Sequence, residues 1–158
     1  MNSLPHWTLE PARPEDVDRV CDLKDQVMRA DLERLGRWDP QRSRRRVRDA
    51  FSTAHTSVLL VEGAFAGSLS VRPDERGGRH LELFYLAPHL QGRGLGTAVL
   101  RHVLAEADAA GEPVRLVVLR GSAAQRLYER HGFVLEREDR VDVLLVREPR
   151  TRQNRFAT

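Results

Sequence analysis

A glycine-rich turn between a strand-like and a helix-like segment constrains the fold of this chain more than any other feature. Before the turn, residues 81–86 are mostly apolar and end at Pro88, and after it apolar residues recur every four positions from 95 to 110. Glycine lets a backbone approach a ligand closely, and the first amides of a helix lack partners within the helix. The turn is therefore suited to hold a phosphate or diphosphate. Its residues are Gln91, Gly92, Arg93, Gly94, Leu95, Gly96 and Thr97.

Two nucleotide-binding motifs compete for these glycines. The P-loop requires a lysine before Ser or Thr, and residues 91–97 contain no lysine. The dinucleotide fingerprint would need glycine in place of Thr97 and an acidic residue after the next strand, which instead ends in Leu119-Arg120. An arginine there can meet a 2′-phosphate, so an NADP-binding protein stays open. An ordinary strand-to-helix turn stays open too.

The remaining pattern predicts a mixed α/β or α+β chain with a central sheet. Helix-start signals stand at Pro14 and at Asp39-Pro40, and each precedes residues with helical spacing. The first of these helices extends to Leu35, and the buried stripe of the second extends to Ala54. The expected strands are 7–10, 58–61, 65–71, 81–86, 114–119 and a final pair within 133–146, and further helices cover 95–110 and 122–131.

Length and composition predict a single globular domain over residues 1–149, followed by a flexible tail at 150–158. No apolar run approaches the ~20 residues that span a bilayer, and the N-terminus lacks the features of a secretory signal. Cys21 is the single cysteine, so the chain forms no intramolecular disulfide and no thiolate metal cluster. We expect no metal site, no membrane association and a cytoplasmic location.

Two sequence motifs resemble those of a known enzyme family. Residues 91–96 match Q/R-x-x-G-x-G/A, and they follow a strand and Ala87-Pro88. Residues 124–133 are similar to the segment N-x-x-A-x-x-L-Y-x-x-x-G-F, and Gly67 lies where a third strand often has glycine in that family. The chain resembles the GNAT superfamily of N-acetyltransferases over nearly its whole length. In the second motif Gly121 replaces the usual asparagine and is followed by Ser122, which can cap the short helix.

The resemblance implies a mostly antiparallel sheet of six to seven strands flanked by about four helices. It also implies acetyl-CoA as cosubstrate, with the strand ending at Leu86 splayed from its neighbour so that backbone amides bind the cosubstrate and polarise the thioester. The residues implied to contact acetyl-CoA are Tyr85, Leu86, Gln91, Gly92, Arg93, Gly94, Leu95, Gly96, Thr97, Ser122 and Ala124.

The resemblance assigns the catalytic acid to Tyr128, because the tyrosine at this place protonates the leaving thiolate in many family members. A phenol with a pKa of ~10 is protonated at neutral pH. Glu82 is our candidate for the base and for a contact with the acceptor. It alternates with Phe84 and Leu86 on one strand face, so it places a carboxylate on a face that is otherwise apolar over this stretch. A solvated carboxylate at the sheet edge is the alternative, and His80 is the substitute base.

The acceptor amine carries no readable motif. Residues 42–48 form an arginine-rich segment, and in the resembling family the first two helices border the acceptor, so Trp38 and Arg45 are candidate acceptor contacts. A solvated helix face is the competing interpretation. A basic nucleic-acid-binding module is a rival function, but the segment lacks interleaved aromatic residues, so no nucleic acid is expected. The expected partner is a small-molecule or peptide amine, and the sequence leaves the oligomeric state, including a homodimer, open.

Overall fold

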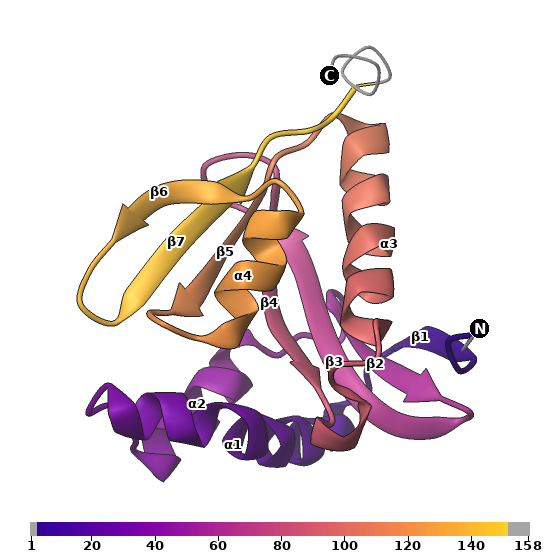
Figure 1. The fold of residues 1–158 in the computed structure, drawn as a ribbon. Helices are drawn as coiled ribbons and strands as arrows, with labels where there is room; N and C mark the ends of the chain where they lie inside the picture. The colour runs from indigo at the N-terminus through magenta and orange to yellow at the C-terminus, as the bar shows by residue number, and fades with distance from the viewer. Residues whose placement is uncertain (1–2, 152–158) are drawn as a thin grey trace. The chain divides into compact units, whose positions relative to one another are not determined.

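The computed structural model describes residues 3–151 and alternates strands and helices along the chain (Figure 1). Short 3-10 turns lie at Pro14–Asp16 and Pro88–Leu90. The strands and helices are β1 (Trp7–Pro11), α1 (Val17–Arg34), α2 (Pro40–Ala50), β2 (Thr56–Val61), β3 (Ala64–Pro73), β4 (Arg79–Leu86), α3 (Leu95–Ala110), β5 (Val114–Leu119), α4 (Ala123–Arg130), β6 (Val134–Glu138) and β7 (Asp142–Arg147).

The strands form one seven-stranded sheet with the order β1-β2-β3-β4-β5-β7-β6. The pairs β1–β2, β2–β3, β5–β7 and β6–β7 are antiparallel, whereas β4 and β5 pair in parallel. The sheet is therefore mixed and mostly antiparallel, and four α-helices occur in the described residues. This confirms the predicted fold class.

The chain divides into two compact units, and β4 contributes to both. Among the described residues, the first unit holds 3–71 and 82–96, and the second holds 72–81 and 97–151. The single-domain organisation inferred from length stays a prediction. Residues 152–158, most of the predicted tail, lie outside the described residues.

In the first unit, α1 and α2 pack side by side and bury an apolar cluster against β4 (Figure 1). Its buried members are Val20, Cys21, Val47 and Leu83. The α2 helix begins as the sequence predicts, because Asp39 accepts a hydrogen bond from the Arg42 N–H at 3.1 Å and Pro40 follows it. It ends at Ala50, however, since Phe51 is extended, so the helical stripe expected to reach Ala54 is too long.

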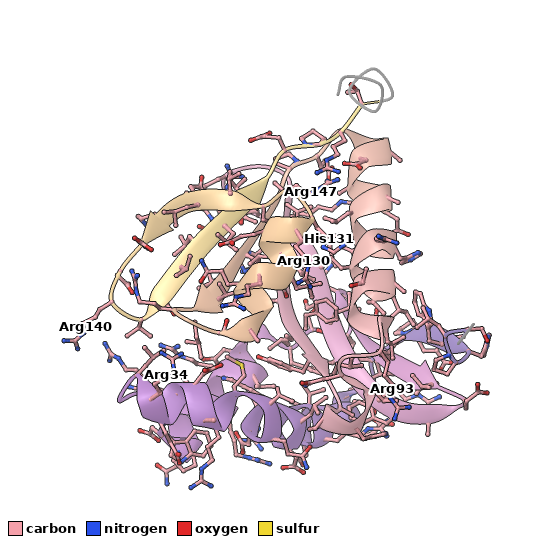
Figure 2. All side chains as sticks on the ribbon, in the orientation of Figure 1. Arg34, Arg93, Arg130, His131, Arg140 and Arg147 are labelled. Atoms are coloured by element: carbon pink, nitrogen blue, oxygen red, sulfur yellow. The ribbon has the colours of Figure 1, made fainter. Side chains whose placement is uncertain are left out.

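In the second unit, α3 supplies an apolar face with the predicted spacing. Val99, Val103 and Ala107 are at most 3% exposed, which confirms the buried stripe. The strand β7 ends in a buried ion pair, in which the Arg147 guanidinium donates to both carboxylate oxygens of Asp108 at 2.8 and 3.1 Å. Arg147 also donates to the carbonyl of His131 at 3.0 Å, and Figure 2 labels both residues. These bonds join α3, β7 and the end of α4.

None of the helices within residues 3–151 combines the length and the apolar character that crossing a bilayer requires.

Candidate functional site

The predicted glycine-rich turn lies between the 3-10 turn and the start of α3. Gly92 and Gly94 have φ angles of 76° and 86°, a left-handed conformation that glycine adopts at little cost. Leu95 is 1% exposed and anchors the first turn of α3, whereas Arg93 is exposed and extends from the loop in Figure 2. An ideal Cβ on Gly92 would meet no atom within 4 Å, so the space beside this backbone is open. The arrangement suits an anion at the helix start.

Gln91 fixes this loop to the end of β4. Its side-chain amide donates a hydrogen bond to the Leu86 carbonyl at 2.9 Å. The family resemblance implies that both residues contact acetyl-CoA, but it does not predict this bond. The bond orients the loop through a side chain. Because the donor to the Leu86 carbonyl is the Gln91 side chain, this bond uses no backbone N–H of the loop.

The strands β3 and β4 approach each other closely at Gly67. An ideal Cβ at this position would lie 2.3 Å from the Tyr85 carbonyl oxygen, so no larger residue fits without movement of the backbone. The Ala87 N–H donates to the Ala66 carbonyl at 2.8 Å just beyond this point. The glycine that sequence analysis singled out is therefore required by the backbone geometry of the end of β4.

Leu83 interrupts β4 with a φ angle of 53°, a conformation that a branched residue in a strand rarely adopts. Its carbonyl accepts a hydrogen bond from the buried Ser68 hydroxyl at 2.7 Å, and its side chain belongs to the apolar cluster of α1 and α2. A residue in this conformation turns the local backbone amide and carbonyl out of the regular ladder, as a bulge does. The sequence does not predict this conformation, because nothing in the apolar alternation of residues 81–86 marks the position.

Glu82 directly precedes this interruption and is half-buried. Leu83 and Tyr85 both contact the α1–α2 cluster, which agrees with the predicted grouping of odd-numbered β4 residues on one face. Glu82 itself makes an interaction within the protein. Glu82 thus lies in the irregular part of β4, next to the left-handed backbone of Leu83.

His80 has a carboxylate partner that sequence analysis did not identify. Its Nδ1 lies 3.2 Å from Asp74 Oδ2, and the two side chains are 13% and 5% exposed. Asp74 also accepts hydrogen bonds from the N–H and the guanidinium of Arg76. Burial opposes ionisation of Asp74, but these hydrogen bonds outweigh it and hold its pKa at about 2. The carboxylate thus orients the imidazole, as in pairs that prepare histidine for proton transfer.

Tyr128 lies on α4 and is 7% exposed. Its ring packs edge to face against Phe133, with centroids 5.5 Å apart and planes at 67°. Burial raises the pKa of the phenol well above its usual value, because the charged phenolate would lose its hydration. The hydroxyl therefore stays protonated over the whole working range of pH, as a proton donor requires.

The start of α4 differs from the prediction in one respect. Ser122 occupies the N-cap position, but its hydroxyl makes no capping hydrogen bond, so the predicted cap is wrong. Within residues 3–151 the Ser122 hydroxyl is instead one of two buried side-chain groups that lack a hydrogen-bond partner. Gly121 precedes it with a φ angle of 77°, and Ala124 is exposed in the first turn. The side chain at the start of α4 is therefore buried without a hydrogen bond in the described residues.

Most of the arginines of α2 bind to the protein itself. Arg44 forms ion pairs with Asp22 and Asp25 at 3.0 and 3.3 Å, and Arg48 pairs with Asp18 at 3.1 Å. The segment therefore carries less free positive charge than its sequence suggests.

The two predicted acceptor contacts have different surroundings. Arg45 is exposed on α2. The Trp38 ring is half-buried and is covered by the Arg29 guanidinium, which lies 4.9 Å from the ring centroid. Arg45 is thus open to solvent, whereas one face of Trp38 is already occupied.

Comparison with known proteins decides the family. The model of the Acetyltransferase (GNAT) family matches residues 19–133, which include the glycine-rich turn, the irregular part of β4 and Tyr128. The chain belongs to this family. It is accordingly an acyl-CoA-dependent N-acetyltransferase with acetyl-CoA as cosubstrate. No curated protein matched the sequence.

Solved structures of GNAT proteins share the fold at low sequence identity. The PaiA N-acetyltransferase of Thermoplasma acidophilum, in complex with coenzyme A, is 14% identical with a TM-score of 0.70, and the match covers 90% of this chain and 99% of that one. The ribosomal-protein-S18-alanine N-acetyltransferase of Escherichia coli is 18% identical with a TM-score of 0.69, covering 94% and 98%. N-acetylglutamate synthase of Neisseria gonorrhoeae, complexed with coenzyme A and L-arginine, is 16% identical with a TM-score of 0.65, covering 94% and 34%.

Proposed function

We propose that this GNAT protein transfers an acetyl group directly from acetyl-CoA to a primary amine, with Glu82 as base and Tyr128 as acid. The observation that carries the proposal is the left-handed backbone of Leu83 in β4, directly after Glu82, a conformation that we infer releases backbone N–H groups from the ladder. Backbone N–H groups released in this way can donate to the thioester oxygen as negative charge develops on it. Such donors are already oriented, so they stabilise the transition state without reorganisation.

The cosubstrate's diphosphate would be held at the start of α3. The first helical amides point out of the helix end and carry its positive partial charge, and the loop around Gly92 leaves space beside them. Gln91 keeps the loop against the end of β4 through Leu86. The family resemblance also assigns Ser122 to the cosubstrate, and its hydroxyl has no other hydrogen-bond partner in the described residues. These groups fit a phosphorylated thioester and require no lysine.

The acceptor amine must lose a proton before or during its attack on the thioester carbon. We assign this role to Glu82, acting directly or through water, because it is the carboxylate next to the irregular part of β4. His80 is a second candidate, favoured by one observation, its contact with Asp74 at 3.2 Å. Replacement of each residue in turn separates the two candidates.

The departing thiolate needs a proton, and we assign its source to Tyr128. When the carbon–sulfur bond breaks, the electron pair goes to sulfur and the phenolic proton follows it. Because burial raises the pKa of Tyr128, the phenol is protonated before the reaction, and the proton taken from the amine restores it through solvent. No covalent enzyme intermediate is needed.

Two alternative functions receive less support. Family membership favours acetyl transfer over NADP or nucleotide binding at the same turn. The pairing of Arg44 and Arg48 with aspartates of α1 argues against a nucleic-acid surface on α2. The test is calorimetric titration with acetyl-CoA, NADP and a DNA duplex, followed by thiol-release assays over a library of primary amines. We expect acetyl-CoA to bind and at least one amine to release thiol; binding of NADP or duplex with no thiol release would contradict the proposal.

A further inference from the structure

Arg147, the last residue of β7, places a buried guanidinium between α3 and the end of α4. It is 4% exposed, and its two terminal nitrogens donate to the carboxylate of Asp108 on α3. Its Nε donates to the His131 carbonyl at 3.0 Å, and Figure 2 labels these two residues. A guanidinium holds its donors in one rigid plane, so a carboxylate bound to one side sets the direction of the remaining N–H. The ion pair with Asp108 therefore fixes where the His131 carbonyl lies.

Asp108 is held by a further hydrogen bond of its own. Its Oδ1 also accepts from the Arg150 N–H at 2.9 Å, and its side chain is 10% exposed. Burial opposes ionisation of Asp108, but the hydrogen bonds from Arg147 and Arg150 outweigh it and lower the pKa of this carboxyl. The carboxylate is therefore ionised at neutral pH and keeps Arg147 in one orientation.

The turn at residues 131–133 carries this constraint to Tyr128. The Tyr128 carbonyl accepts hydrogen bonds from the N–H of His131 at 2.9 Å and from the N–H of Phe133 at 3.2 Å. The Phe133 ring is buried and packs edge to face against the Tyr128 ring. Both the backbone and the ring of Tyr128 thus contact the turn whose first carbonyl binds Arg147. All of these residues belong to the second compact unit.

Gly132, in the middle of this turn, shows how closely the arginines approach it. Its φ angle of 93° is left-handed, which glycine adopts at little cost. An ideal Cβ here would lie 2.5 Å from Nη2 of Arg150 and 3.7 Å from Nε of Arg147. The guanidinium groups therefore pack directly against the turn, and the turn has little freedom to move while Arg147 stays in place.

We propose that Arg147 is a positioning residue for acetyl transfer, which places the Tyr128 hydroxyl for proton donation by fixing the turn at residues 131–133. This inference rests on the proposed function and adds a residue that acts through Tyr128. Misplacement of a catalytic group by about 1 Å can lower a rate by about a hundredfold, so the orientation of α4 matters for turnover. A lysine at position 147 would keep the charge beside Asp108, but it lacks the planar set of donors that also reaches the turn.

The kinetic arm of the test is a double-mutant cycle between Arg147 and Tyr128 in thiol-release assays. We expect Arg147→Lys to lower kcat at least about tenfold and to change KM for acetyl-CoA less than about twofold. In the Tyr128→Phe background the same change should lower kcat by less than about twofold, because the group that it positions is already absent. Equal losses of kcat in the two backgrounds, or an unchanged kcat in Arg147→Lys, overturn the proposal.

The matched control for this cycle is Arg115→Lys. Arg115 is a half-buried arginine of β5 that also binds a carboxylate, that of Glu136, and also donates to a backbone carbonyl, that of Gly77 at 3.1 Å. None of these three residues lies on α4 or in the turn at residues 131–133. We expect Arg115→Lys to keep the kcat of wild type; a loss as large as that of Arg147→Lys contradicts a specific role of Arg147.

A second variant separates positioning from folding. Arg147→Met combined with Asp108→Leu replaces the buried ion pair by apolar side chains of similar size, a change that is often neutral for stability. It also removes the hydrogen bond to the His131 carbonyl. We expect urea unfolding close to that of wild type together with the low kcat of Arg147→Lys. A variant that folds as wild type does and turns over at the same rate overturns the proposal.

The structural arm observes the Tyr128 ring without any reaction. Tyr85 and Tyr128 are the two tyrosines of the chain, so protein labelled with 13C at the ring ε carbons of tyrosine gives NMR signals from two residues. Tyr128→Phe identifies which signals belong to Tyr128. We expect Arg147→Lys to shift these signals and Arg115→Lys to leave them in place. Tyr128 signals that are identical in wild type and Arg147→Lys overturn the proposal.

The outcomes distinguish failure of this inference from failure of the proposed function. Unchanged kcat in Tyr128→Phe contradicts the proposed acid and, with it, the kinetic part of this inference. A reduced kcat in Tyr128→Phe, with equal losses for Arg147→Lys in both backgrounds, contradicts the inference alone. If no amine releases thiol, the proposed function fails, and the NMR signals alone decide whether Arg147 positions the ring.

Discussion

The hydroxyl of Ser68 donates a hydrogen bond to the carbonyl of Leu83 at 2.7 Å, and this bond joins β3 to the left-handed residue of β4. Ser68 is fully buried, so water cannot replace the donor. The bond gives the Leu83 carbonyl a buried side-chain partner. The geometry beside Glu82 therefore depends on a side chain of the neighbouring strand.

Replacing Ser68 by alanine should destabilise the protein and impair acetyl transfer. The Leu83 carbonyl would stay buried without its partner, which costs about 1–3 kcal/mol in the free energy of unfolding. Relaxation of Leu83 toward an ordinary strand conformation would also lower kcat. Urea unfolding and thiol-release kinetics measure the two effects.

The matched control for this prediction is Ser70→Ala. Ser70 lies two residues further along β3 and is equally buried, but its hydroxyl has no hydrogen-bond partner in the described structure. Removal of this hydroxyl should either stabilise the fold or lower the free energy of unfolding by less than about 1 kcal/mol. Equal losses in both variants would show that the Ser68–Leu83 bond has no special role.

The helix α3 and the glycine-rich turn were predictable because their signals are local. Val99 and Val103 repeat at helical spacing, and Gly92 and Gly94 mark a turn that needs left-handed backbone. Such features depend on residues within one or two turns of the chain. The sequence was therefore sufficient to locate the start of α3 and the candidate phosphate-binding loop.

Leu83 and Asp74 were not predictable for the opposite reason. The conformation of Leu83 depends on a bond from Ser68 on another strand and on packing against α1 and α2, and leucine itself prefers ordinary strand angles. The contact of Asp74 with His80 requires the geometry of the turn between β3 and β4. Likewise, Asp18 and Arg48 pair across 30 positions of the chain, so their sequence shows two charges but not their neutralisation. Tertiary contacts decide each of these cases.

Replacing Tyr128 by phenylalanine should lower kcat by about a hundredfold or more and leave the affinity for acetyl-CoA nearly unchanged. The phenylalanine ring preserves the edge-to-face contact with Phe133, so the loss would come from the hydroxyl. Because burial raises the pKa of Tyr128, its protonated form persists, and its titration should not reduce kcat between pH 7 and 9. Steady-state kinetics and calorimetry measure both quantities; an unchanged kcat would remove Tyr128 from the mechanism.

Replacing Glu82 by glutamine should lower kcat/KM for the acceptor amine and alter its dependence on pH. Glutamine keeps the size and the hydrogen-bonding atoms of the side chain but cannot accept the amine proton. The measurement is kcat/KM against pH for one acceptor in Glu82→Gln, His80→Gln and wild type. A profile that is unshifted in Glu82→Gln and shifted in His80→Gln would transfer the role of base to His80.

Replacing Asp74 by asparagine should remove an acid-sensitive part of the stability. The pKa of Asp74 is about 2 in the fold and ~3.9 in an unfolded chain, so its ionised form is favoured by folding. A lowered folded pKa contributes stability above pH ~4, and this contribution disappears as the pH falls toward 2. Asp74→Asn should therefore unfold more easily than wild type at pH 6, by an amount of order 1 kcal/mol, and the difference should shrink at pH 3. Urea unfolding at the two pH values measures the difference in stability. The control is Glu75→Gln, an exposed change in the same turn. A difference between Asp74→Asn and wild type that does not depend on pH would show that the charge of Asp74 does not stabilise the turn.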